Sequence, residues 1–423
     1  MRAFFESLAA RASIRGAGTA IVSAAGTISY AELIERVRGH AQWATRLPSR
    51  VGVLFSKGPD QFLADLALSF AGKELVPLPD FFSDAQITHI IESTRLSTIV
   101  ADARNFTRAT EFGIDVQALA TDVLPSRAPA LDAGRIIFTS GTTGTPKGVR
   151  LTGSQLLASV GALADASGAT SSDRYLSVLP NALLLEQIAG TYLPLSVGAM
   201  ICVCGGGAAQ QGNIGAALAG VAEQAKATAT VLVPEILGAW LRELQVNGQR
   251  APQSLRFVAV GGAPVSRTFA EAAWEQGLPV YEGYGLSECS SVVALNRPCE
   301  RRPGTVGKPL PNVQLTIEND EIVVGGPTVM DGYIGGPPHQ GPWHTGDLGR
   351  FDEDGFLIVS GRKDNVIVTA AGRNINPEWV EEVFTSDTRI KRCVIVEYER
   401  ELVALVVHTE AALCVNVPAM LDL

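Results

Sequence analysis

The first three hundred residues alternate short apolar runs with stretches whose apolar residues follow helical spacing. An apolar run at 51–55 is followed by a helical pattern at 60–72 and by a second apolar run at 97–102. This order of strand, helix and strand is typical of a parallel sheet that helices cover on both faces. The sequence therefore predicts an α/β fold built on doubly wound sheets. Further strand-like runs of the same kind lie at 135–140, 175–180, 199–204, 229–234 and 255–262.

The pattern changes twice toward the C-terminus. From Val313, short alternating runs are broken by Gly, Pro, Asp and Asn, which predicts the hairpins of a small antiparallel, β-barrel-like subdomain. Further on, the sequence predicts one helix at 377–384 and two strands at 393–399 and 402–408. We therefore predict a large N-terminal domain over residues 1–364 and a short α+β domain over residues 365–423.

Composition disfavours two classes of function. The 423-residue chain is 46% hydrophobic and 18% charged, which is typical of a globular protein with a large core. Its 34 Lys and Arg against 43 Asp and Glu give a net charge of -9, which disfavours binding to nucleic acids and to acidic membranes. A phosphate ligand therefore needs a local site in which backbone donors act together with one or two cations.

The cysteines and the apolar stretches indicate a compartment. Six cysteines in a chain of this length do not form a disulfide framework, and Cys202 and Cys204 are too close for a CxxC site. Glu6 and Arg11 interrupt the apolar residues at the start, unlike the core of a secretory signal. The most apolar stretch, from Leu193, is too short to span a bilayer. We expect a cytoplasmic protein with no membrane span.

The segment 138–149, FTSGTTGTPKGV, is the sharpest functional signal. Three glycines and five hydroxyl side chains directly follow a predicted strand, and Lys147 adds a positive charge. Backbone N–H groups in such a loop can turn inward and hold a polyphosphate. It is not a P-loop, because Pro146 and Gly148 stand where that motif needs Gly and Ser or Thr. The alternative is a surface loop rich in Gly and Thr, which this long ordered string disfavours.

A second segment, YEGYGLSECSS at 281–291, combines an aromatic ring, a hydroxyl and a carboxylate. Tyr284 can stack on a base, Ser287 can contact a phosphate, and Glu288 can bind magnesium. A competing interpretation is the GxSxG elbow of esterases, with Ser287 as the nucleophile. Cys289 occupies the place of the last glycine of that motif, which argues against a hydrolase. Taken alone, the segment also fits an ordinary turn.

A third segment covers 344–365. Asp347 and Arg362, each at the edge of a predicted strand, offer an acceptor and a fork of donors suited to the two vicinal hydroxyls of a ribose. Solvated charges on a hairpin are the alternative.

These three segments, in this order and at this spread, resemble the adenylate-forming superfamily of acyl- and aryl-CoA ligases, carrier-protein-loading adenylation domains and luciferases. The resemblance runs from Thr27 to Glu382, and the strings LRFVAVGGAPVS, GTVGKPLPNV and EIVVGGPTVMDGYIG support it. Separate surface loops would not fall into one family's order, so the combination outweighs the alternatives for each segment.

The resemblance implies two half-reactions. A carboxylate attacks the α-phosphate of ATP to give an acyl-adenylate and pyrophosphate, and a thiol of coenzyme A or of a phosphopantetheine arm then displaces AMP. It implies ATP and magnesium as cofactors, a small carboxylic acid as substrate and, where the acceptor is a pantetheine arm, an acyl carrier protein as partner.

The resemblance also implies roles for single residues. Tyr284 would stack on adenine with Gly262 and Ala263 on its other side, Ser287 would meet the α-phosphate, and Glu288 would bind magnesium. Asp347 and Arg362 would hold the ribose, Asp364 would be the hinge of a C-terminal lid, and Gly372 would face the pantetheine tunnel. The β- and γ-phosphates would be held by Thr139, Ser140, Gly141, Thr142, Thr143 and Lys147.

The sequence departs from the family's pattern at three places. Leu183, Leu184 and Leu185 replace the histidine or aromatic residue of many relatives, and we expect them to form a pocket for an apolar fatty or aromatic acid. Thr152-Gly153 stands where Thr-His is common. The sequence ends before the region of the family's adenylation lysine, so we expect a shortened lid and slow adenylation. The alternative function is a nucleotide-binding protein of this fold with weak or lost turnover.

Overall fold

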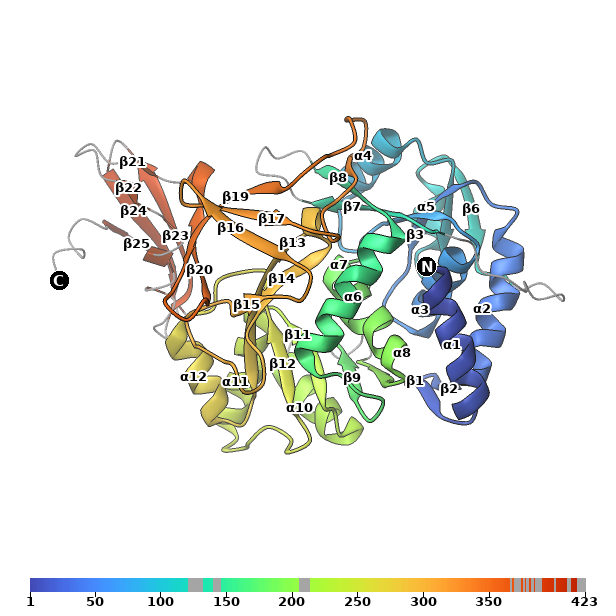
Figure 1. Ribbon diagram of the computed structural model, residues 1–423, viewed down its shortest axis with the longest axis horizontal. Helices are drawn as coiled ribbons and strands as arrows, with labels where there is room; N and C mark the ends of the chain where they lie inside the picture. The colour runs from blue at the N-terminus through green and yellow to red at the C-terminus, as the bar shows by residue number, and fades with distance from the viewer. Residues whose placement is uncertain are drawn as a thin grey trace.

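The computed structural model describes residues 1–120, 132–139, 146–204 and 214–365, and several shorter stretches beyond them: 367–368, 374–375, 377, 380–381, 384, 390–398, 401–408 and 412–416. Two large, mainly parallel sheets form the body of the protein, and smaller antiparallel sheets follow toward the C-terminus (Figure 1). The α/β fold with doubly wound sheets that the sequence predicts is confirmed.

A seven-stranded sheet lies in the N-terminal half. Its strands run in the order β18-β8-β7-β4-β3-β5-β6, and the five from β7 to β6 are parallel. β8 pairs with β7 as a hairpin, and β18, from much later in the chain, pairs with β8. The bounds are β3 (Arg50–Leu54), β4 (Glu74–Pro77), β5 (Thr98–Ala101), β6 (Asp115–Ala118), β7 (Arg135–Thr139), β8 (Lys147–Leu151) and β18 (Gly332–Tyr333).

A nine-stranded sheet follows, in the order β15-β14-β13-β12-β11-β9-β10-β1-β2. Its six central strands, from β13 to β1, are parallel, and antiparallel strands complete it at both ends. The bounds are β1 (Thr19–Ser23), β2 (Gly26–Ser29), β9 (Arg174–Ser177), β10 (Met200–Val203), β11 (Ala229–Leu232), β12 (Phe257–Val260), β13 (Val280–Leu286), β14 (Ser291–Leu295) and β15 (Lys308–Pro309).

Helices form a central layer between the two sheets and a further layer on each outer face. The central core joins side chains of both sheets with those of α1 (Arg2–Arg15), α2 (Tyr30–Ala44), α3 (Pro59–Phe70), α6 (Gly153–Ser167), α7 (Leu184–Gln187), η1 (Ile188–Tyr192) and α8 (Leu193–Val197). A second core packs the nine-stranded sheet against α10 (Ile214–Ala225), α11 (Pro234–Val246) and α12 (Arg267–Glu275). The seven-stranded sheet carries α4 (Asp84–Thr94) and α5 (Phe106–Thr110) on its outer face.

The start of α6 explains one departure from the family's pattern. Thr152 caps the helix in a capping box with Gln155, which satisfies backbone N–H groups of the first turn. A Cβ at Gly153 would collide with the Asp132 carboxylate and the Met1 side chain. The glycine lets the N-terminus of the chain pack closely against this helix.

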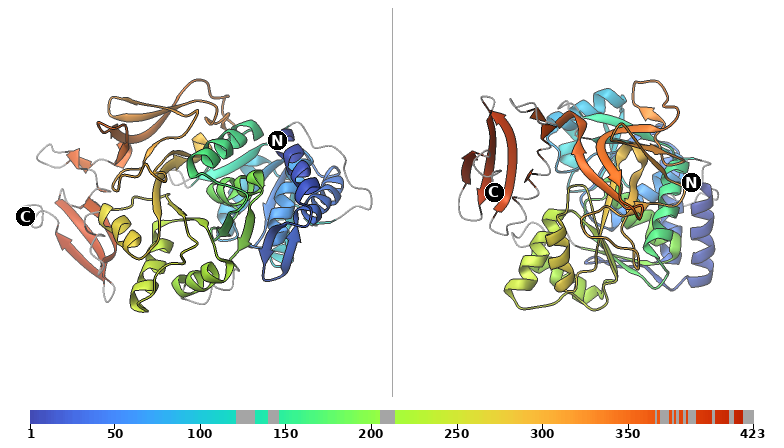
Figure 2. Two further views of the ribbon diagram at one scale, coloured as in Figure 1. Left: turned by 60° about the horizontal axis from the view of Figure 1, so that its bottom comes forward. Right: turned by 60° about the vertical axis from the view of Figure 1, so that its left-hand side comes forward.

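The C-terminal part consists of antiparallel sheets. The predicted hairpin region is a four-stranded sheet in the order β16-β17-β19-β20, with β16 (Gln314–Glu318), β17 (Glu321–Gly325), β19 (Trp343–Phe351) and β20 (Leu357–Arg362). Beyond it lie β21 (Ile367–Val368), β22 (Asn374–Ile375) and a three-stranded sheet of β23 (Ile390–Tyr398), β24 (Glu401–His408) and β25 (Ala412–Asn416). Figure 2 shows the last sheet at one end of the molecule.

The small C-terminal core agrees with the predicted helix and strands. Pro377, Val380, Glu381 and Phe384 are helical, and Val380 and Phe384 pack against the inner face of the sheet of β23 and β24. The predicted domain boundary at residue 364 falls in the short helix η3 (Lys363–Asn365). Among the residues that the structure describes, none of the helices combines the length and the apolarity needed to cross a bilayer.

Candidate active site

The hairpin of β7 and β8 brackets the predicted phosphate loop. Thr139, the last residue of β7, lies opposite Lys147, the first residue of β8, and Phe138 lies opposite Gly148. A Cβ at Gly148 would come within 2.7 Å of the Ile334 side chain, so glycine lets the chain after β18 lie close to the hairpin. Lys147 is exposed and is therefore available to an anion. Ser140, Gly141, Thr142 and Thr143 lie outside the described residues.

The second segment forms a tight antiparallel hairpin. Tyr284 lies in β13, Ser287 begins the short 3-10 helix η2 (Ser287–Cys289), and the chain returns in β14. A Cβ at Gly285 would collide with the backbone of Ser291, so only glycine permits this close pairing. The esterase elbow needs a strand, a sharp turn and an α-helix. Ser287 instead sits between two antiparallel strands, which removes the structural basis for the hydrolase interpretation.

Tyr333, to which the sequence analysis gave no role, connects Lys147 with Glu288. Its hydroxyl donates to Glu288 Oε1 at 2.8 Å, and Lys147 Nζ lies 5.7 Å from the centre of its ring. Burial and the neighbouring Glu288 carboxylate raise the pKa of the Tyr333 hydroxyl, which therefore remains a donor at neutral pH. Lys147 and Glu288, which are remote in sequence, thus both contact Tyr333. The lysine lies over the face of the ring, and the carboxylate accepts a hydrogen bond from the hydroxyl.

Asp347 joins the second segment to the third. Asp347 and Arg362 are direct partners in the register of β19 and β20, and Arg362 Nε lies 3.4 Å from Asp347 Oδ1. The Tyr284 hydroxyl donates to Asp347 Oδ2 at 2.5 Å, and burial together with this carboxylate raises the pKa of Tyr284. Arg362 also donates to the Thr345 carbonyl at 3.1 Å. The structure therefore brings together three of the predicted nucleotide ligands.

Gly262 and Ala263 lie at the same edge of the sheet. They are exposed in the loop after β12, and Gly262 has a φ of +85°, which favours glycine. β12 is the parallel neighbour of β13, with Val260 opposite Glu282. The loop therefore emerges beside Tyr284, at the carboxyl ends of parallel strands where open α/β sheets bind ligands. Asp364, the predicted hinge, is exposed in η3. We call the set Lys147, Tyr284, Glu288, Tyr333, Asp347 and Arg362 the polar end.

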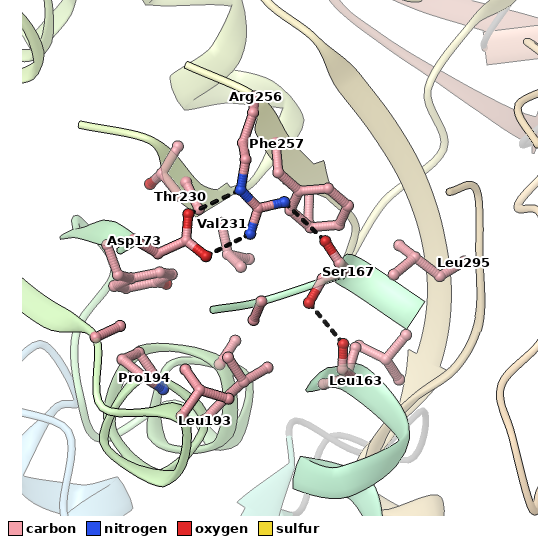
Figure 3. Close-up of a pocket in the computed structure, with 18 of the residues that line it drawn as sticks. Leu163, Ser167, Asp173, Leu193, Pro194, Thr230, Val231, Arg256, Phe257 and Leu295 are labelled. Carbon is pink, nitrogen blue, oxygen red and sulfur yellow. Dashed lines mark hydrogen bonds and ion pairs between the residues drawn. The ribbon is translucent and has the colours of Figure 1, made fainter. Parts of the chain in front are cut away.

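An apolar cavity lies against the nine-stranded sheet (Figure 3). The cavity proper holds about 50 Å³, enough for a few water molecules, within a space of about 580 Å³ that includes a part open to solvent. Its lining is almost entirely apolar and comes from α6, η1, α8 and the strands β9, β11, β12 and β14. We call this feature the apolar cavity.

The three leucines predicted to form a substrate pocket point in different directions. Leu185 lines the apolar cavity, and Leu183 packs with it on a cluster around Tyr175 and Val231. Leu184 is only 5% exposed and belongs to the central core between the sheets. Successive residues of a helical turn point about 100° apart, so the side chains of three consecutive residues cannot share one wall. Leu185 therefore lines the apolar cavity and Leu184 does not, and a substrate pocket formed by all three leucines remains a prediction.

A buried polar cluster holds the loop that precedes these leucines. Glu186 is fully buried, accepts from Tyr175 Oη at 2.9 Å and from Ser177 Oγ, and lies 3.6 Å from Lys57 Nζ. Lys57 also donates to the Leu179 carbonyl. Burial raises the pKa of Glu186 and lowers that of Lys57, because it disfavours both charges. The cluster ties the end of β3 to the end of β9.

The profile of the family described as AMP-binding enzyme matches residues 8–334, well over half of the chain. The chain belongs to the AMP-binding enzyme family. The match spans both large sheets and includes Lys147, Tyr284, Glu288 and Tyr333 of the polar end, and it confirms the resemblance to adenylate-forming enzymes.

Similar members of the family include 2-succinylbenzoate–CoA ligases of Bacillus. That of Bacillus cereus is 29% identical over 414 aligned positions, which cover 89% of this chain and 82% of the relative. The solved o-succinylbenzoate CoA synthetase of Bacillus subtilis, in complex with its acyl-adenylate intermediate, is 25% identical, with a TM-score of 0.85 over 98% of this chain and 90% of that one. An anthranilate CoA ligase bound to anthranoyl-AMP has the same TM-score at 18% identity, which shows the shared fold.

This AMP-binding enzyme is an AMP-forming acid–thiol ligase, the class that the sequence predicts. The sequence analysis named five of the six residues at the polar end. It missed Tyr333, although the residue lies in one of the quoted family strings, and it missed the buried pair of Lys57 and Glu186. A tyrosine and an ion pair of this kind carry no local signal, because their partners are far away in the sequence.

Proposed function

We propose that this enzyme uses ATP to activate an apolar carboxylic acid and passes the acyl group to the thiol of coenzyme A. The observation that carries the proposal is that two unlike sites lie next to each other at the nine-stranded sheet, because Tyr284 of the polar end lies in β13 and the apolar cavity lies against its neighbours β12 and β14. A cation, a carboxylate and ribose-type ligands gather at the polar end, and an apolar cavity runs along the strands that lead to it. An acid group at the mouth of this cavity would face the α-phosphate of a bound nucleotide.

The chain's residues fit ATP. Thr139, Lys147 and the loop between them would hold the β- and γ-phosphates, with Lys147 opposing their charge. Ser287 would meet the α-phosphate. Asp347, which already accepts from Tyr284, would accept from the ribose hydroxyls beside Arg362. Gly262 and Ala263 would lie along adenine opposite the Tyr284 ring.

The fit to magnesium rests on Glu288. Among the described residues no group of three His, Cys, Asp or Glu side chains is placed to hold a metal. Magnesium at nucleotide sites needs only one or two carboxylates, because phosphates and waters supply its other ligands. The bound ion would offset phosphate charge during attack. Tyr333 would keep the Glu288 carboxylate aimed at this position.

The substrate and the acceptor are proposed from the cavity and the relatives. Relatives are named as ligases of 2-succinylbenzoate and anthranilate, so a ring-bearing acid is the first candidate and a fatty acid the second. Coenzyme A is the acceptor of those relatives, and a phosphopantetheine arm of an acyl carrier protein offers the same thiol. Buried free thiols at Cys202, Cys204 and Cys289 suit the reducing cytoplasm.

Two further parts of the proposal concern the C-terminal region. Residues 1–364 would form the body that binds ATP and the acid, and residues 365–423 would form the lid that turns about Asp364 between the half-reactions. Exposure of Asp364 in a three-residue helix supports a hinge there, since a change in its backbone angles breaks little packing.

A carboxylate screen tests the proposal. The purified chain is incubated with ATP, magnesium and single acids, and AMP and pyrophosphate are measured with coenzyme A, a phosphopantetheinylated carrier or no acceptor. We expect AMP with at least one apolar acid and thioester with coenzyme A. Tight ATP binding without AMP from any acid would favour the alternative, a nucleotide-binding protein that has lost turnover.

A further inference from the structure

One histidine side chain contacts both ends of the predicted phosphate loop between β7 and β8. His89 lies in the middle of α4, the helix that packs on the outer face of the seven-stranded sheet (Figure 1). Its ring meets the Phe138 ring edge to face, with the ring centres 6.3 Å apart, and Phe138 directly precedes Thr139 at the start of the loop. Its Nε2 lies 3.1 Å from the carbonyl oxygen of Pro146, which directly precedes Lys147 at the end of the loop.

The contact with Pro146 is a hydrogen bond with a single possible direction. A carbonyl oxygen only accepts, so Nε2 of His89 carries the hydrogen and donates it. The ladder between β7 and β8 ends with the pair of Thr139 and Lys147, and Pro146 lies just beyond this last pair. The hydrogen bond from α4 therefore supports the chain one residue past the ladder, on the side of the loop.

The opposite side of Lys147 is supported from β18. The backbone N–H of Ile334 donates to the Gly148 carbonyl at 2.8 Å. A Cβ at Gly148 would lie 2.7 Å from the Ile334 side chain and 3.0 Å from the Phe138 ring, so both side chains pack closely on this glycine. Lys147 thus lies between two fixed neighbours, Pro146 held by α4 and Gly148 held by β18.

We propose that His89 is a positioning residue, which fixes Lys147 where the lysine meets the β- and γ-phosphates of ATP. The proposal deepens the proposed function and rests on it, because it assumes that the loop and Lys147 hold these phosphates. AMP lacks both phosphates. Loss of the His89 hydrogen bond should therefore weaken the binding of ATP and of pyrophosphate, and not that of AMP. A residue that only stabilised the fold would not discriminate between the two nucleotides.

Equilibrium binding tests the proposal without a carboxylic acid. We would measure the Kd of ATP, of pyrophosphate and of AMP, each with magnesium, by titration calorimetry. His89→Phe and His89→Leu keep an apolar contact with Phe138 but cannot donate, and two such variants guard against one that does not fold. We expect the Kd of ATP and of pyrophosphate to rise roughly three- to tenfold in both, the range that one hydrogen bond gives, with the Kd of AMP unchanged. His89→Gln has an amide that can donate to the same carbonyl, and it should restore most of the ATP affinity.

His40 supplies a matched control. It also donates from a helix, α2, to a backbone carbonyl, that of Ala120 at 2.7 Å, but beyond β6 at the opposite edge of the same sheet. His40→Phe should leave all three affinities unchanged, and thermal unfolding checks that each variant is folded.

Lys147→Ala distinguishes a failure of this proposal from a failure of the proposed nucleotide site. If it weakens ATP binding while the folded His89 variants keep the wild-type ratio of ATP to AMP affinity, His89 does not position the loop and the proposed site stands. An equal loss of ATP and AMP affinity in the His89 variants would refute the positioning role as well. If Lys147→Ala keeps the wild-type ratio, the lysine does not hold the phosphates and both proposals fail.

Discussion

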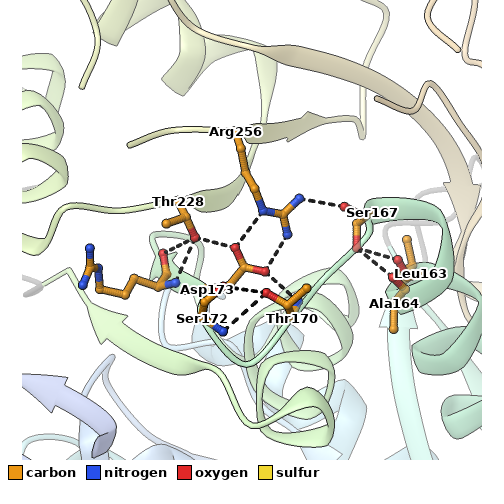
Figure 4. A network of polar contacts seen from close by, with 9 residues as sticks. Leu163, Ala164, Ser167, Thr170, Ser172, Asp173, Thr228 and Arg256 are labelled. Carbon is orange, nitrogen blue, oxygen red and sulfur yellow. Dashed lines mark hydrogen bonds and ion pairs between the residues drawn. The ribbon is translucent and has the colours of Figure 1, made fainter. Parts of the chain in front are cut away.

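The polar end, which draws on three sheets, and the apolar cavity, which lies against one, are built in opposite ways. The polar end consists of side chains from loops and strand ends that are far apart in the sequence, such as Lys147, Glu288 and Asp347. The apolar cavity consists mostly of residues within regular strands and helices, and its two charged lining residues, Arg256 and Asp173, form an ion pair with each other (Figure 4). Charges are offered to a ligand at the first site and neutralised within the protein at the second.

This contrast indicates that substitutions at the polar end should change the rate of AMP formation, whereas substitutions at the apolar cavity should change the preference among acids. An exposed cation at the polar end contributes only when a charged ligand is present. A leucine in the cavity wall contributes to folding and to fit at the same time. The following predictions separate these effects, from the largest to the smallest.

The largest effect is expected at the polar end. Lys147→Ala and Glu288→Ala should each lower the rate of AMP formation by roughly 100- to 1000-fold, since losing one group that stabilises developing charge costs about 3 to 4 kcal/mol of barrier. The measurement is pyrophosphate release at saturating ATP. Lys226→Ala, at an exposed lysine after α10, is the control and should retain full activity. Wild-type rates in the two site variants would remove both residues from the proposed site.

Two neighbouring leucines should separate folding from fit. Leu184→Ala removes a core side chain between the sheets and should lower the free energy of unfolding by about 3 kcal/mol, without changing the relative rates with different acids. Leu185→Ala enlarges the apolar cavity and should shift the preference among acids of different length or ring size. Urea unfolding and the carboxylate screen measure the two effects. A change of preference in Leu184→Ala alone would mean that the acid lies elsewhere.

The strand β13 between the two sites contains a carboxylate with a perturbed pKa. Glu282 is 3% exposed and receives a hydrogen bond from Asn296 Nδ2 at 3.1 Å, while its Oε1 has no partner among the described residues. Burial raises its pKa to about 6 from an ordinary value of 4.5. The folded protein thus binds more protons than the unfolded chain between these values, and stability falls as the pH rises through this range.

Glu282→Gln should remove this pH dependence. The variant is expected to gain up to about 2 kcal/mol of stability relative to wild type at pH 8 and little at pH 4.5, as a pKa rise of this size implies. Urea unfolding at both values measures the difference. An equal change at both values would show that packing, and not the charge, is responsible.

The smallest effect concerns Tyr333. Tyr333→Phe removes the donor to Glu288 and keeps the ring beside Lys147, so the magnesium concentration for half-maximal rate should rise about tenfold, equivalent to about 1.4 kcal/mol. Tyr281→Phe, whose ring stacks on Phe257 in the core, is the control. A fall in the maximal rate with an unchanged magnesium requirement would argue against a role in orienting Glu288.

The fold was largely predictable from the sequence because strand and helix periods are local properties. The predicted runs at 51–55, 97–102 and 135–140 became β3, β5 and β7, and the hairpin region became the four-stranded sheet. Five of the six residues of the polar end could be named from the sequence because they lie in contiguous segments, whereas Tyr333 could not, because its partners Lys147 and Glu288 are far away in the sequence. The apolar cavity was not, because Leu184 and Leu185 look alike in sequence and only tertiary packing assigns one to the core and the other to the cavity.

The pairing of β18 with β8 has a consequence for how the protein is made. Gly332 and Tyr333 pair with this side of β8, the neighbouring Asp331 and Ile334 also donate backbone hydrogen bonds to it, and these residues follow Leu151 by nearly two hundred residues. At about 5 to 20 residues per second, a ribosome needs roughly 10 to 40 s to synthesise the intervening chain. During that interval the hairpin beside the phosphate loop is an open sheet edge, the kind of surface on which nascent chains pair wrongly. The strand whose Tyr333 donates to Glu288 therefore also ends the period in which this edge is exposed to aggregation.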